Sequence, residues 1–117
     1  MSAPNIVNVA TITGKTAVQA VGTSPAAIVT NSGSSNKVFK INALYISNID
    51  GTNDADVSVD LFRSSTAYHI AKTVVVPNDT TLDAITKALY LEEGDSLRIT
   101  ASATSDIEAV CSYEEIS

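Results

Sequence analysis

Apolar and polar residues alternate with a period of two along much of the chain, the pattern of β-strands with one buried and one solvated face. The clearest case is the segment 89–116. Within it, one set of residues alternates strictly with another: Leu97, Ile99, Ala101 and Ala103 with Ser96, Arg98, Thr100 and Ser102. This segment predicts strand, turn, strand, turn and strand, with the turns at 92–95 and 104–106, and it indicates an all-β fold.

The middle of the chain continues the pattern. Strands are expected over 38–49 and 55–63, and the Asp50-Gly51 pair between them is a favoured turn pair, so we expect these strands to form a hairpin. The first of them changes phase between Ala43 and Leu44, which indicates either a β-bulge or burial on both faces.

Two further elements follow. A strand is expected over 67–76 after a Ser64-Ser65 turn, with one set of apolar residues on one side: Tyr68, Ile70, Val74 and Val76. Residues 82–87 fit a strand-like crossover better than a helical turn, because Ile85 and Thr86 are β-branched.

Residues 1–36 are only weakly apolar. Their apolar groups at 6–12, 17–21 and 26–29 are separated by glycines and predict short strands. An alternative is that 1–36 contains an extended amino-terminal arm that orders against neighbouring subunits. With eight to ten short strands, the expected fold class is all-β: a single-domain antiparallel β-sandwich over 1–117, either jelly-roll or immunoglobulin-like.

Charge and hydropathy restrict the partners. The 117 residues include seven basic and thirteen acidic side chains, a net charge of -6, with no basic cluster, so nucleic acid is not an expected partner. Apolar runs such as 74–76 are far shorter than the roughly 20 residues that cross a bilayer, so no membrane partner is expected. The amino terminus lacks the order of a secretory signal, so secretion by a signal peptide is not expected either.

No residue group carries recognisable catalytic chemistry. Cys111, the single cysteine, is in phase with Ala109 and Tyr113, which predicts a buried, inert thiol. His69 is the single histidine, and we expect it on a solvent or interface face of its strand. The carboxylate pairs Glu92/Glu93 and Glu114/Glu115 lie in a turn and on a strand, where neighbours do not share a face. We therefore predict a non-enzyme with no catalytic residue and no cofactor.

The loop from Asp50 to Asp56 superficially resembles a calcium loop, with oxygen ligands at alternate positions. An EF-hand is excluded, because Ala55 stands at its glycine position and Leu61 at its bidentate glutamate position. We expect an ordinary turn in this loop, and a less regular Ca²⁺ site is the alternative. One histidine and one cysteine cannot build a zinc site within one chain, so no metal site is predicted.

Several stretches of the sequence belong together in order and spacing. The chain opens with MSAPNIVNVATITGKT, continues with KINALYISNIDGTNDADVSVDLF and YHIAKTVVVPNDTTL, and ends with YLEEGDSLRITASA followed by SYEEI. These stretches resemble small virion structural proteins of marine tailed bacteriophages, with cyanophage-like head decoration and tail-associated proteins among them. The resemblance implies a β-sandwich assembled in many copies on a virion in the host cytoplasm, as a capsid decoration or cement protein or as a tail or fibre component.

A small sandwich must also protect its edge strands, which favours homo-oligomerisation. Closed rings satisfy every interface, so we expect a trimer first and a pentamer or hexamer second, in contact with other virion proteins. An alternative function is a carbohydrate-binding module for attachment to host surfaces, which needs aromatic platforms. The tyrosines lie on different predicted strands, and we expect at least two of them to point inward: Tyr45, Tyr68, Tyr90 and Tyr113.

Overall fold

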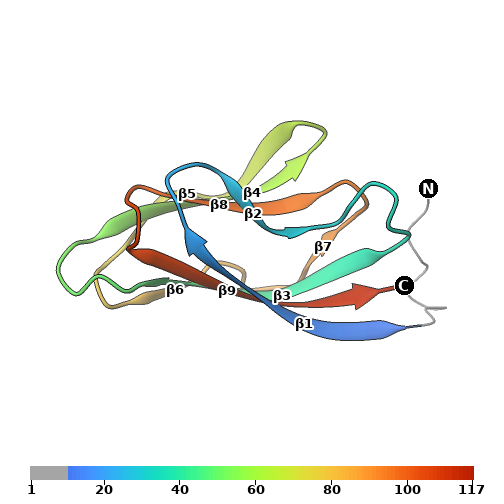
Figure 1. Cartoon of the computed structure of the whole chain (residues 1–117), viewed down its shortest axis with the longest axis horizontal. Coiled ribbons are helices and arrows are strands. Elements are labelled where there is room, and N and C mark those ends of the chain that lie inside the picture. The colour runs from blue at the N-terminus through green and yellow to red at the C-terminus, as the bar shows by residue number, and fades with distance from the viewer. Residues whose placement is uncertain (1–10) are drawn as a thin grey trace.

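The computed structural model describes residues 11–117, which form nine strands and no helix. The strands build two antiparallel sheets that pack face to face (Figure 1). Sheet A has the order β1-β9-β3-β6, with β7 also pairing with β3, and sheet B has the order β2-β8-β4-β5. The expected all-β antiparallel sandwich is confirmed. The strand bounds are β1 Ile12–Val21, β2 Ala26–Thr30, β3 Val38–Asn48, β4 Ala55–Arg63, β5 Thr66–Val76, β6 Thr81–Asp83, β7 Leu89–Leu91, β8 Ser96–Ala101 and β9 Ile107–Ile116.

The core is made of branched aliphatic side chains from the inner faces of both sheets. Sheet A contributes Ile41, Leu44, Ile46 and Leu91, and sheet B contributes Val57, Val59, Leu97 and Ile99. The alternation seen in the sequence is confirmed in β8, where Leu97 and Ile99 are fully buried. Each such side chain stabilises the fold by about 1.5–3 kcal/mol relative to exposure, so the sandwich needs neither Trp nor a disulfide.

A β-bulge lies in β3, as the change of phase in the sequence indicated. The pairing of β3 with β9 shifts register between Ile41 and Ala43, and the extra residue, Asn42, is exposed. The bulge returns Leu44 to the inner face after Ile41. It thereby also directs Tyr45 to the outer face of sheet A.

The prediction that β3 and β4 form a hairpin is wrong. The strands belong to different sheets, and residues 49–54 cross from sheet A to sheet B. Buried Asn48 holds this crossing, because its Nδ2 donates to the carbonyl oxygens of Asn53 at 3.0 Å and Val76 at 2.9 Å. Gly51 does not adopt the positive φ of a tight hairpin turn; Gly94 is the one glycine of residues 11–117 that has a positive φ. Alternation identified both strands but not their partners.

A hairpin does join β4 to β5. Ser64 and Ser65 form its turn, with φ angles of 52° and 59°. The register places Tyr68 opposite Leu61 and Val74 opposite Val57, so Tyr68 and Val74 share the inner face of sheet B. Tyr68 is nevertheless exposed, because β5 is the last strand of its sheet.

The ambiguous segment 82–87 forms no helical turn, but the expected crossover is wrong, because the chain begins it in β6 and continues irregularly along the same edge of β3 to β7. Strands β6 and β7 pair with opposite ends of β3, and Ile85 is buried in the connection between them. The turns predicted at 92–95 and 104–106 are also present.

The strands expected at 17–21 and 26–29 are confirmed within β1 and β2, which pair with β9 and β8 of the same chain. Most of the apolar group at 6–12 lies outside the described residues. Contact of an amino-terminal arm with neighbouring subunits stays a prediction.

Candidate functional site: surfaces for self-association

The single cysteine and the single histidine, the candidate nucleophile and base, lie on different sheets. Cys111 is fully buried on β9 of sheet A, and burial raises the pKa of its thiol to about 11. His69 is exposed on β5 of sheet B, in register with Asp60. The thiol is therefore protonated at neutral pH and has no base beside it.

The carboxylates of the loop from Asp50 to Asp56 serve the loop itself. Asp50 accepts hydrogen bonds from the backbone amide of Thr52 at 2.8 Å and from Asn53, and these bonds lower the pKa of Asp50. Asp54 accepts from the amide of Asn78 at 3.0 Å. Within residues 11–117, no group of three His, Cys, Asp or Glu side chains is placed to hold a metal ion.

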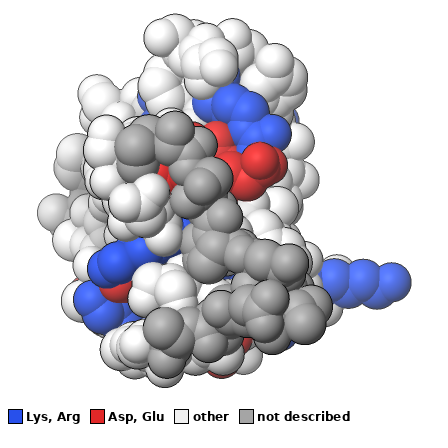
Figure 2. Space-filling model, turned by 90° about the vertical axis from the view of Figure 1, so that its right-hand side faces the viewer, with Lys and Arg blue, Asp and Glu red and all other residues white. Residues whose placement is uncertain are grey.

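One glutamate of each pair, Glu115 and Glu92, forms ion pairs at the end of the molecule where β1 begins and β9 ends. Glu115 contacts Lys15 at 2.9 Å and Lys37 at 3.0 Å, and the hydrogen bond from Lys15 is the main cause of its lowered pKa. Glu92 contacts Arg63 at 2.8 Å. Figure 2 views this end and shows basic and acidic side chains side by side. These ion pairs link neighbouring strands and turns, and the carboxylates are not arranged as a catalytic pair.

The tyrosines do not converge on one platform. Tyr45 and Tyr90 are exposed on the outer face of sheet A, whereas Tyr68 is exposed on β5 of sheet B. Tyr113 packs against Phe39 with ring centroids 5.7 Å apart. Two of the four, Tyr68 and Tyr113, lie on inner sheet faces as expected, but Tyr68 is exposed there, so three of the four tyrosines contact solvent.

An apolar row crosses the outer face of sheet A. Val18 of β1 lies opposite Val110 of β9, and Val110 lies opposite Tyr45 of β3. Their exposed fractions are 75%, 40% and 46%. We call these three residues the outer row. Large apolar side chains aligned on a sheet face mark an interaction surface more often than isolated ones do.

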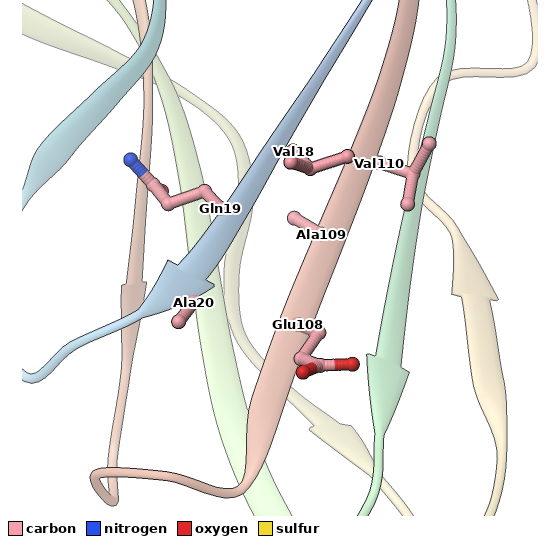
Figure 3. Close-up of a pocket in the computed structure, with 6 residues that line it drawn as sticks. All are labelled: Val18, Gln19, Ala20, Glu108, Ala109 and Val110. Carbon is pink, nitrogen blue, oxygen red and sulfur yellow. The ribbon is translucent and has the colours of Figure 1, made fainter.

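A shallow hollow of about 260 Å³ lies beside this row, between β1 and β9. Figure 3 shows Val18 and Val110 next to one another, with Ala20 further along β1 and Glu108 further along β9. The hollow holds no cluster of polar groups that would orient a small ligand. It fits an apolar contact from another protein surface.

Strand β1 is the second candidate feature. It is ten residues long, it pairs with β9 without a register shift, and it contains no proline. Among residues 11–117, no strand pairs with its other edge. Its one charged side chain, Lys15, lies on the face that carries Glu115 and is held there by the ion pair. A long edge strand that has no bulge or proline, and whose single charge is held in an ion pair, is open to pairing with another strand.

The other edges of the described sheets are interrupted. Strand β5 has two register shifts against β4, a positive φ of 52° at Thr73 and an exposed Lys72. Strand β2 has five residues and a register shift, and β6 has three residues. Short, bulged or charged edges resist pairing with other chains, so β1 is the exception.

Sequence patterns missed these surfaces for a physical reason. In β1, Ala17 and Val21 face the core while Val18 and Ala20 face outward, so apolar residues occupy both faces and their spacing does not identify the buried one.

Among the described residues, no helix is long and apolar enough to cross a membrane.

Comparisons with known proteins support the fold. No protein-family model matches the chain, and no curated protein matches it. A Bacillus endospore appendage protein, from a family that forms disulfide-linked pili, has a TM-score of 0.53 and 15% identity, over 100% of this chain and 96% of its own. A pentameric capsid protein from metagenomic phage sequences has a TM-score of 0.43 and 15% identity, over 86% of this chain and 60% of its own. The appendage protein thus shares the sandwich fold with this chain.

Proposed function

We propose that this protein is a non-enzymatic structural subunit of a bacteriophage virion, acting through protein–protein contacts in a multi-copy assembly on the capsid or tail. The observation that carries the proposal is the outer row of Val18, Val110 and Tyr45, three exposed apolar residues in register on one sheet face. Burying such a row between copies removes apolar area from water, which drives association.

The virion assignment rests on the sequence stretches that resemble tailed-phage structural proteins. The fold is compatible with it, because the endospore appendage protein of the same fold is a pilus component. Covalent linkage of the kind found in those pili does not carry over. This chain has a single cysteine, and Cys111 is buried inside the sandwich, so it is not placed to form a disulfide with another copy.

Self-association is tested by sedimentation of the purified protein from low to high micromolar concentration. The double variant Val18→Ser/Tyr45→Ser should weaken association roughly tenfold or more, as loss of central apolar anchors does. The matched control is Val75→Ser/Tyr68→Ser, which removes an exposed Val and an exposed Tyr from β5, with exposed fractions of 55% and 57%. A monomeric wild-type protein, or equal effects of the two double variants, would contradict the proposal.

The virion assignment needs a separate measurement. Purified phage particles that encode this chain should contain it in many copies, counted by quantitative mass spectrometry against the major capsid protein. Its absence from intact particles would rule the assignment out, even if the isolated protein self-associates.

A further inference from the structure

We infer that β1 pairs antiparallel with β1 of a second copy about a two-fold axis at Thr16, which joins the two A sheets into one. The inference rests on the proposed self-association and adds to it a backbone contact at the β1 edge, which adjoins the outer row at Val18. It starts from the uninterrupted free edge of β1, where the side chains on the outward face are uncharged.

Alternate residues of β1 direct their backbone groups away from β9. Thr11 and Ser117 exchange both hydrogen bonds, Thr11 N to Ser117 O at 3.0 Å and Ser117 N to Thr11 O at 2.9 Å. In an antiparallel ladder such pairs alternate with pairs that do not bond to one another. With no register shift along β1, a set of alternate residues directs its N–H and C=O groups away from β9: Ile12, Gly14, Thr16, Val18 and Ala20.

The edge that fits β1 best is β1 of a second copy. A long open ladder needs a partner edge of similar length and regularity. Among residues 11–117, β5, β2 and β6 are bulged or short, so the one matching edge that a second copy offers is β1 itself. Pairing of one surface with the same surface on a second copy requires a two-fold axis.

The length of β1 determines the register of the pair. With Thr16 facing Thr16 of the second copy, every outward-bonding residue finds a partner within β1. Val18 then faces Gly14, and Ile12 faces Ala20, so each large side chain meets a small one. The space over Gly14 is open, since no atom lies within 4 Å of where its Cβ would be. Shifting the axis to Gly14 or Val18 leaves residues at one end of the strand without a partner in β1.

The charges on β1 are compatible with this pairing of two copies. The outward side chains of β1 are uncharged, and Lys15 stays on the opposite face in its ion pair with Glu115. The contact closes on two copies, so it favours dimers, or larger assemblies with an even number of copies such as a hexamer, over the trimer expected from sequence.

Cysteine cross-linking tests the register directly. Residues facing each other in a bonded antiparallel pair have Cα atoms about 5.5 Å apart, within the roughly 4.4–6.8 Å that a disulfide spans. Thr16→Cys should therefore cross-link two copies under mild oxidation. Gly14→Cys should not, because two copies of residue 14 would lie about 14 Å apart along the strands. The double variant Gly14→Cys/Val18→Cys should restore cross-linking, and buried Cys111 should not contribute.

A proline variant tests the edge without a disulfide. The amide of Thr16 points away from β9, so Thr16→Pro removes no hydrogen bond inside the monomer. We expect an unchanged strand signature by circular dichroism and a loss of most self-association in sedimentation.

The outcomes separate the two proposals. If wild-type protein self-associates but Thr16→Cys cross-links no better than Gly14→Cys, or Thr16→Pro associates normally, the β1 contact is wrong while self-association stands. If the wild-type protein is monomeric at high micromolar concentration, both the β1 contact and self-association are overturned.

Discussion

Asp95 and Asp60 are the two buried carboxylates within residues 11–117, and each is paired with an arginine. Arg98 bonds Asp60 at 2.9 Å and lies 3.9 Å from the ring centre of Phe62. Arg63 bonds both oxygens of Asp95. The amide of Glu92 donates a third bond to Asp95 at 2.8 Å. These side chains hold strands and a turn in place and are not reactive groups.

The pairing of Asp95 makes stability depend on pH. Burial raises the pKa of Asp95, but the hydrogen bonds from Arg63 and Glu92 and the charge of Arg63 outweigh it, so the pKa lies below its ordinary value of 3.8. A carboxyl with a lower pKa when folded stabilises the fold fully above its unfolded pKa and loses that contribution as pH falls below about 4. Urea unfolding of the wild-type protein between pH 5 and pH 3 should show this loss.

Asp95→Asn should lower the free energy of unfolding by about 2 kcal/mol at pH 7, because it leaves Arg63 without its buried partner while Arg63 stays partly solvated. The variant should also lose less stability than wild type between pH 5 and pH 3. Asp83→Asn, on exposed β6, serves as the control and should change little. An unchanged pH profile in Asp95→Asn would contradict the role of this ion pair.

Among the elements, the β4–β5 hairpin carries a local strain that the sequence could reduce. Ser64 and Ser65 both have positive φ, which costs L-residues other than Asn, Asp and Gly about 1–2 kcal/mol each. Asn-Gly is the favoured pair for such a two-residue turn. Ser64→Asn/Ser65→Gly should raise the free energy of unfolding by about 1 kcal/mol in urea titrations.

The control for this turn is Ser34→Gly, an exposed loop serine that is not among the residues with positive φ. Glycine there frees the unfolded chain without relieving strain, so it should stabilise nothing and cost a few tenths to about 1 kcal/mol. Equal effects of the two changes would show that turn strain is not the cause.

Elements were predictable where one face is apolar and the other polar. Leu97 and Ile99 identified β8, and the phase change near Ala43 identified the β3 bulge. The β3–β4 hairpin was wrongly expected, because Asp50-Gly51 describes a local turn while the choice of sheet depends on distant partners such as the contact from Asn48 to Val76. The outward face of β1 was hidden, because Val18 is as apolar as the inward Val21.

At the scale of the whole molecule, the sandwich separates two kinds of surface. Ion pairs tie strands together at the end where β1 begins and β9 ends (Figure 2), while the outer row and the outward side chains of β1 are uncharged. The chain as a whole carries a net charge of -6. Association through uncharged surfaces therefore has to overcome repulsion between like-charged copies.

The repulsion between like-charged copies determines how self-association responds to salt. Raising NaCl from 20 to 300 mM shortens the screening length from roughly 20 Å to below 10 Å, which weakens the repulsion but leaves apolar and backbone contacts intact. The dissociation constant of the wild-type protein should fall roughly threefold or more in sedimentation. Glu108→Gln, which removes a negative charge opposite Ala20, should tighten association at low salt and reduce the response. Weakening of association by salt would instead indicate a contact built on ion pairs, and it would count against both the outer row and the β1 edge.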